Sequence, residues 1–113
     1  MLQSLLKILP PARGALAVKL TGVSGFTGRG SVRFSPDGQG GGALLVMLNG
    51  LAGRSADIFA DGAFAANIAI TNGRANAIFS SSKGDKLPAI EDGAQIDIHQ
   101  NGDVVLSGVL TRA

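Results

Sequence analysis

Apolar and polar residues alternate along most of the chain, from residue 14 to the C-terminus. A period of two is typical of β-strands that turn one face toward a core. Glycine-bearing turns separate the alternating segments, at a spacing of about ten residues. The pattern predicts an all-β fold, an antiparallel β-sandwich or small barrel of mostly up-and-down topology. The expected strands are 14–20, 30–34, 42–50, 56–60, 63–70, 75–81, 94–99 and 103–110.

The stretch "FAANIAITNGRANAIFSSS" contains the turn Asn72-Gly73 between two alternating segments. Asn-Gly supplies the positive φ angles that a type I′ turn requires. We therefore expect a hairpin that pairs 63–70 with 75–81, and expect Phe64 to share an inward face with the isoleucines of its strand. The same turn chemistry recurs at Asp61-Gly62 and Asn101-Gly102.

The segment 42–50 is apolar on both faces. Leu44, Val46 and Leu48 share one face, and Leu45 and Met47 share the other. A strand of this kind is covered on both sides, either at the centre of a sandwich or by a partner. It is a candidate interaction surface.

The first nine residues carry the clearest helical pattern, because Leu2, Leu5, Leu6 and Leu9 follow i, i+3, i+4 and i+7 spacing. Pro10-Pro11 ends the pattern, which divides the chain into a helix over 1–11 and a β domain over 12–113. A helix this short is stable only when its leucines pack against an apolar surface, either on the sheet of its own domain or on a partner subunit. Ala15-Leu16-Ala17 resembles a signal-peptide cleavage site, but the preceding apolar region is short and contains Lys7.

The amino-acid composition excludes several classes of chemistry for this chain. The 113 residues suit one domain, and 45 % are hydrophobic, yet the chain has no Trp, Tyr or Cys. The absence of cysteine excludes disulfides and thiolate chemistry, and no apolar run reaches the length of a membrane span. The sequence assigns no compartment.

The net charge of +2 is small, but its distribution is uneven. Such asymmetry could steer self-association or attract an acidic partner, or it could simply reflect solvated strand faces. Nucleic-acid binding is not expected, because the bases are scattered and the five phenylalanines lie mostly at inward positions. Bases gather early (Arg13, Lys19, Arg29, Arg33) and acids late (Asp85, Glu91, Asp92, Asp97, Asp103).

His99 is the only histidine, so a histidine-rich metal site is excluded. The residue types allow one catalytic Ser-His-Asp triad, which would combine His99 with Asp97 or Asp103 and a serine from 80–82. Asp97 and His99 lie on the same outward strand face, which favours a solvated pair, and no G-x-S-x-G motif supports catalysis. We predict no cofactor and no metal, while calcium at two converging acidic turns stays open.

The segment "GSVRFSPDGQGGGALLVMLNGLAG" and the later "GRANAIFSSSKGDKLPAIEDGAQIDIHQNGDVVLSGVL" together resemble chordin-type (CHRD) β domains. The resemblance covers about residues 14–110 and implies a β-sandwich in an extracellular or interaction-type setting. That family carries a histidine-bearing motif after the strand that ends in Asn-Gly-Leu. Here "RSADIFADG" contains no histidine, so a metal or ligand role is not transferred.

These observations predict a non-enzymatic structural or interaction domain that forms a homo-oligomer through apolar surface, with another protein as a possible partner. The alternative is a small-ligand-binding or hydrolytic module that uses the Asp97 and His99 strand face. The predicted interface residues are Leu2, Leu5, Leu6, Leu9, Leu45 and Met47.

Overall fold

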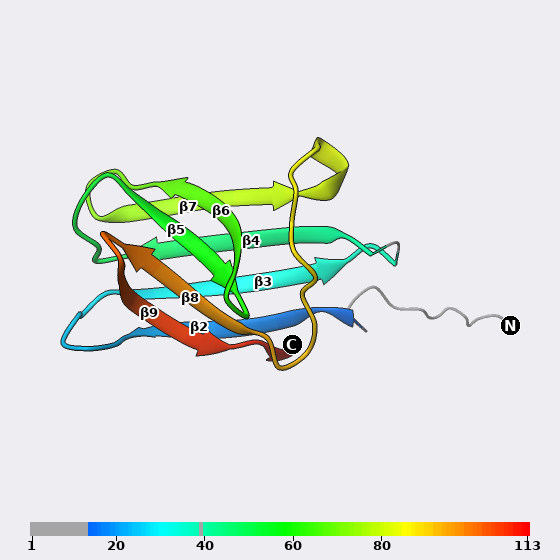
Figure 1. Ribbon diagram of the computed structural model, residues 1–113, viewed down its shortest axis with the longest axis horizontal. Coiled ribbons are helices and arrows are strands. Elements are labelled where there is room, and N and C mark those ends of the chain that lie inside the picture. The colour runs from blue at the N-terminus through cyan, green and yellow to red at the C-terminus, as the bar shows by residue number, and fades with distance from the viewer. Residues whose placement is uncertain (1–13, 39) are drawn as a thin grey trace, which may run out of the picture.

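The computed structural model describes residues 14–38 and 40–113. Within them one antiparallel sheet curls into a nearly closed barrel (Figure 1). The predicted all-β class is confirmed, and the expected helix over 1–11 lies outside the described residues. The strands are β2 (Leu16–Gly22), β3 (Arg29–Pro36), β4 (Gly42–Asn49), β5 (Ser55–Ala60), β6 (Ala63–Ala69), β7 (Arg74–Ser80), β8 (Gln95–Gln100), β9 (Asp103–Val109) and β10 (Thr111–Arg112), with a 3-10 turn η2 (Ser81–Lys83) after β7.

The strands follow the order β6-β5-β8-β9-β2-β3-β4-β7, and β10 pairs with β2 outside this path. Only four of these seven neighbouring pairs are consecutive in the chain, namely β5–β6, β8–β9, β2–β3 and β3–β4. The expected up-and-down topology is therefore only partly present. The crossovers β5–β8, β9–β2 and β4–β7 bring distant segments together and close the sheet.

The hairpin prediction around Asn72-Gly73 is confirmed for the turn but not for the pairing of the strands. Both residues have positive φ, 54° and 79°, as a type I′ turn requires. However, only one bridge follows, between Thr71 and Arg74. Beyond it β6 pairs with β5 and β7 pairs with β4, so the two strands form the two ends of the sheet. The predicted pairing of 63–70 with 75–81 is wrong, because the two strands separate after this single bridge.

The interior is aliphatic except for Phe34 and the partly buried Phe79, and no described polar or charged side chain is buried in it. The side chains of Leu44, Val46 and Leu48 point inward from β4, as the alternation predicts. The segment after η2 crosses the open end of the barrel (Figure 1) and contributes Ile90 to this core. Burial of such apolar area supplies the main favourable free energy of folding.

A bulge reverses one prediction of strand parity. Ile58 lies opposite Ala66 whereas Phe59 lies opposite Phe64, so Ala65 has no partner on β5. One extra residue in a strand interrupts the alternation of side chains, so the residues before it and after it no longer follow a single period of two. Phe64 is consequently 55 % exposed rather than inward. The expectation that the phenylalanines lie mostly inward is wrong, since Phe26 is also exposed and Phe59 projects outward against His99, which leaves only Phe34 and Phe79 packed on the core.

Candidate interaction surfaces

Four bases project outward from one side of the barrel. Lys19 lies on β2, Arg29 and Arg33 on β3, and Arg74 on β7, all at positions that alternate with buried residues. The strand register joins them in rows, since Arg29 faces Asn49 of β4, which faces Arg74. We call the outward surface of β2, β3, β4 and β7 the basic face. No acidic side chain alternates outward along these four strands.

Apolar side chains occupy the centre of the basic face. Leu45 lies between Arg33 and Ile78 across the strands, and Met47 is opposite Ser31 on β3. Leu45 is half-buried, whereas Met47 and Ile78 are 46 % and 54 % exposed. The sequence predicted Leu45 and Met47 as interface residues covered by a second layer or a partner. No described segment of the chain covers Met47 or Ile78.

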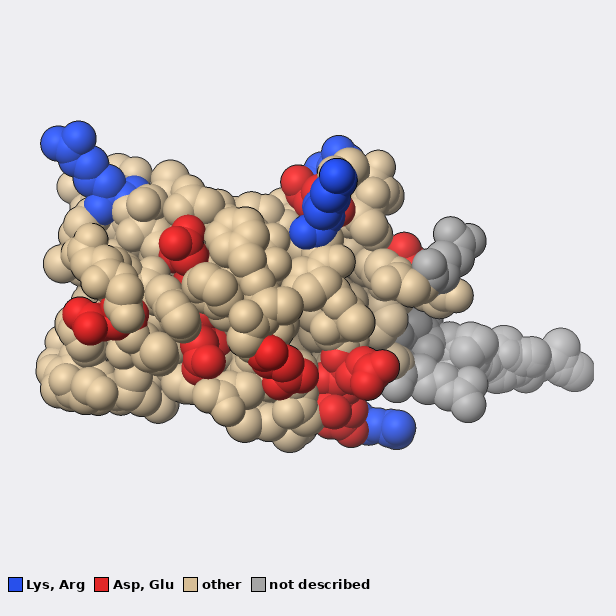
Figure 2. Space-filling view, viewed as in Figure 1, with Lys and Arg blue, Asp and Glu red and all other residues tan. Residues whose placement is uncertain are grey.

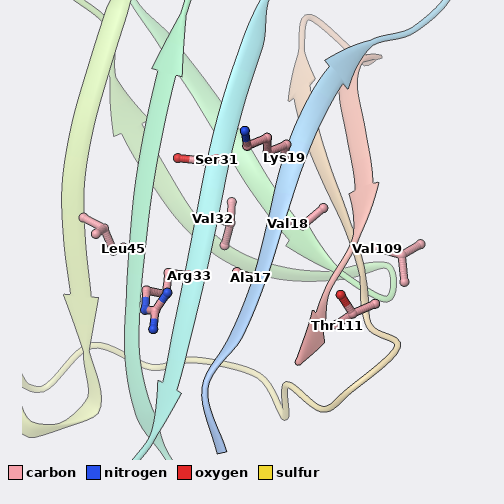
Figure 3. A pocket seen from close by; sticks show the side chains of 9 residues that line it. All are labelled: Ala17, Val18, Lys19, Ser31, Val32, Arg33, Leu45, Val109 and Thr111. Carbon is pink, nitrogen blue, oxygen red and sulfur yellow. The ribbon is translucent and has the colours of Figure 1, made fainter. Parts of the chain in front are cut away.

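The basic face is hollowed in two adjoining places. One hollow has a volume of about 510 Å³. Figure 3 shows the side chains that line it, with Arg33 beside Leu45 and Lys19 across from Ser31. The second, of about 450 Å³, is lined by Lys19, Arg29, Met47 and Arg74 among others. Both hollows share Lys19 and Ser31, so they form one continuous surface.

The side chains of the four bases form no hydrogen bond or ion pair with any described residue. The single ion pair within the described residues joins Arg112 Nε to Asp92 Oδ2 at 3.9 Å, and both side chains are well exposed. The positive charge of the basic face is therefore not neutralised within residues 14–38 and 40–113.

The opposite side of the barrel carries acids. Asp57 on β5 and Asp97 on β8 project outward near its middle, and Asp61 and Asp103 lie in turns or strand starts toward opposite ends. Phe59 and Phe64 project outward beside them; we call the outward surface of β5, β6, β8 and β9 the acidic face. Figure 2 shows acidic side chains over the middle of this side and bases only at its margins.

Polar side chains on the acidic face bond one another. Asp97 Oδ1 accepts hydrogen bonds from Ser107 Oγ at 2.6 Å and from Gln95 Nε2 at 3.1 Å. Asp57 Oδ1 accepts one from Asn67 Nδ2 at 2.9 Å. Hydrogen bonds to carboxylates are stronger than those between neutral groups. These carboxylates are held in place by neutral donors and keep their negative charge unneutralised.

His99 stacks on Phe59, with ring centroids 4.2 Å apart, and Phe59 meets Phe64 edge-on at 5.8 Å. No hydrogen bond joins the His99 ring to Asp97 or to a serine within the described residues. The candidate serines lie elsewhere, where Ser80 and Ser81 bond Asp85 and Gly42 at the end of β7. The structure therefore does not assemble the triad that the sequence allowed on paper.

The serine next to Asp97 is Ser107, which the sequence analysis did not single out. The sequence feature that could have identified Ser107 is its outward position in the strand 103–110. The partnership depends on the register of β8 with β9, in which Asp97 lies opposite Ser107. Residue types alone do not determine that register.

Two of the acidic turn residues accept hydrogen bonds from backbone N–H groups. Asp61 Oδ1 accepts a hydrogen bond from the backbone N–H of Gln95, and Asp85 accepts one from that of Ser80. In the part of the chain that the structure describes, no three histidine, cysteine or acidic side chains gather in a group that could hold a metal ion. The helical segments of that part are also too short to cross a bilayer.

Of the predicted interface residues, Leu45 and Met47 lie together on the basic face. The remaining four, Leu2, Leu5, Leu6 and Leu9, lie outside the described residues. No protein-family model matches the chain, and a search of curated proteins finds no match. The resemblance to chordin-type domains stays a prediction.

Proposed function

We propose that this chain is a non-enzymatic interaction domain that self-associates through the basic face. The observation that supports this function is the exposure of Met47 and Ile78 on a continuous sheet face, beside Leu45 and among bases whose side chains have no partner within the described residues. Exposed apolar side chains framed by polar ones are typical of protein interfaces. Arginine and methionine are enriched in such interfaces.

The alternative, a small-ligand or hydrolytic module using Asp97 and His99, has less support. The Asp97 carboxylate already accepts two side-chain hydrogen bonds, and the His99 ring packs on Phe59. A general base must lie within hydrogen-bond reach of the proton that it removes. The arrangement instead fits a side-chain network that stabilises the sheet.

The test is the dependence of molar mass on protein concentration, measured by light scattering for the full chain. We expect the wild-type mass to rise above that of a monomer. Met47→Asp and Leu45→Asp should weaken the association at least tenfold, because each buries a carboxylate in the contact. Phe26→Asp is the matched control, since Phe26 is exposed in the β2–β3 connection and should leave association unchanged. A wild type that stays monomeric at millimolar concentration would contradict the proposed function.

The leucines of residues 1–11 form a second proposed association element. Burying each leucine stabilises an assembly by roughly 1.5–3 kcal/mol, provided that the leucines pack against an apolar surface. Deleting residues 1–11, or replacing Leu5 and Leu6 with Asp, should give a folded β domain of lower oligomeric state. A truncated chain that keeps its native mass, or one that unfolds, would show that these leucines belong to the domain's own core.

A further inference from the structure

We infer that the partner seated on the basic face is the acidic face of a second copy of the chain, in a heterologous, face-to-face contact. This inference rests on the proposed function, because it names the occupant of the same surface. It follows from three features of the two faces: the sign of their charge, the position of their apolar residues and their lack of ion pairs.

Charge excludes the simplest alternative, a two-fold symmetric dimer of basic faces. A two-fold interface brings the same patch of both copies together. Here it would bring eight bases into one contact, four from each copy (Lys19, Arg29, Arg33 and Arg74), with no outward acid on these strands to offset them. Like charges brought together at an interface cost several kcal/mol. A self-association that uses Leu45 and Met47 therefore needs a different surface on the second copy.

The acidic face has the matching chemistry. Asp57 and Asp97 project from its middle, next to the exposed ring of Phe64 and the half-buried ring of Phe59. Stacked against the basic face, these rings would cover Leu45, Met47 and Ile78. The carboxylates would meet arginines, which form charge-assisted hydrogen bonds with carboxylates, and these can add to the bonds that the carboxylates already accept. Neither set of charges has an ion pair within the described residues.

The expected contact is small. Four strands spaced about 4.8 Å apart and about 23 Å long cover about 450 Å² per copy, or about 900 Å² when both copies are counted, which is below the range of stable interfaces and within that of weak, transient ones. The association should thus be weak and sensitive to salt, because rim charges are screened at high ionic strength. Since the two faces lie on opposite sides of the barrel, each added copy exposes a fresh face, and the assembly grows as an open chain or a ring.

The experiment uses two charge-reversed full-length chains. The basic-reversed chain carries Lys19→Glu and Arg33→Glu, and the acidic-reversed chain carries Asp57→Lys and Asp97→Lys, the two carboxylates that project from the middle of the acidic face. Control chains carry Lys86→Glu or Glu91→Lys, which reverse exposed charges in the segment between η2 and β8, off both faces. Circular dichroism and thermal melting establish that every chain is folded, and a variant that melts early is replaced by the corresponding alanine pair.

Sedimentation velocity then gives the result. The wild type should form species larger than a dimer at low salt, with at least tenfold weaker association at 0.5 M NaCl. Each reversed chain alone should be monomeric, because it retains only one intact face. An equimolar mixture of the two should form a one-to-one complex and nothing larger, since one chain offers only its acidic face and the other only its basic face. The control chains should behave as wild type.

Other outcomes identify other occupants and overturn the inference. If the acidic-reversed chain associates as well as wild type while the basic-reversed chain does not, the basic face is a working surface but its partner is not the acidic face; the proposed function then stands. If deleting residues 1–11 from that acidic-reversed chain abolishes the association, the N-terminal leucines are the occupant. If the wild type is monomeric but binds phosphatidylglycerol vesicles that the basic-reversed chain does not bind, the occupant is an anionic membrane, and the proposed function also fails.

Discussion

The two outer faces of the barrel are built by the same alternation but use their polar residues differently. On the acidic face Asp57 and Asp97 accept hydrogen bonds from neighbouring side chains, and His99 stacks on Phe59. On the basic face the side chains of the four bases bond no described residue. Polar groups that bond one another contribute to folding, whereas unpaired ones leave stability unchanged and stay available to a partner. The comparison predicts that substitutions on the acidic face lower stability and that those on the basic face do not.

We expect the largest loss of stability at β3, where inward Gly30 and outward Ser31 are neighbours and mark the boundary between the core and the basic face. A Cβ at Gly30 would lie 2.7 Å from Leu48 Cδ2 and 2.9 Å from the backbone oxygen of Met47. Gly30→Val should therefore lower the free energy of unfolding by about 1–3 kcal/mol. Ser31→Val, the control, should leave it within about 0.5 kcal/mol, as measured by urea denaturation. Equal effects at both positions would contradict the assigned orientation.

Asp97 and Arg33 provide the central comparison between the faces. Asp97→Ala removes the acceptor for Ser107 and Gln95, and we expect a loss of about 1–2 kcal/mol in the free energy of unfolding. Arg33→Ala should cost less than about 0.5 kcal/mol, because its guanidinium bonds no described residue. Chemical denaturation of both variants at a concentration where the chain is monomeric measures the difference. A larger loss for Arg33→Ala would mean that the basic face also stabilises the monomer.

His99 tests the aromatic part of the acidic face. The sequence suggested a solvated side chain of little consequence, but the ring is half-buried against Phe59. His99→Ala should lower stability by about 0.5–1.5 kcal/mol, the range for an aromatic pair. His99→Phe should retain most of that stability, because it preserves the stack. If both variants melt together below wild type, a polar role of the imidazole outweighs its stacking.

Two asparagines give the smallest and most closely matched comparison. Asn67 on β6 donates from Nδ2 to the Ala56 carbonyl oxygen and to Asp57 Oδ1. Asn76 on β7 projects from the basic face opposite Met47 and makes no hydrogen bond to a described side chain. Asn67→Ala should cost about 0.5–1 kcal/mol, and Asn76→Ala should have an effect near zero. Indistinguishable thermal melting of the two variants would remove the distinction between the faces.

The sequence by itself determined the local structure. Alternation located every main strand of the described region, because the orientation of successive side chains depends only on the backbone of that strand. The Asp-Gly and Asn-Gly pairs predicted the turns, because positive φ is a property of those residues; Asp61, Asn72 and Asn101 all have it. The double apolar pattern of 42–50 likewise identified Leu45 and Met47 as outward apolar residues.

Only the tertiary structure decided which strands pair and which charges share a face. The turns at Asn72 and Asn101 have the same chemistry, yet β8 and β9 pair after Asn101 whereas β6 and β7 separate after Asn72. Pairing depends on where each strand lies in the whole sheet, which no local segment encodes. The same holds for the bulge that turns Phe64 outward and for the meeting of Asp97 with Ser107. The separation of bases from acids arises because β7 joins β4 and β5 joins β8, contacts between residues far apart in the chain.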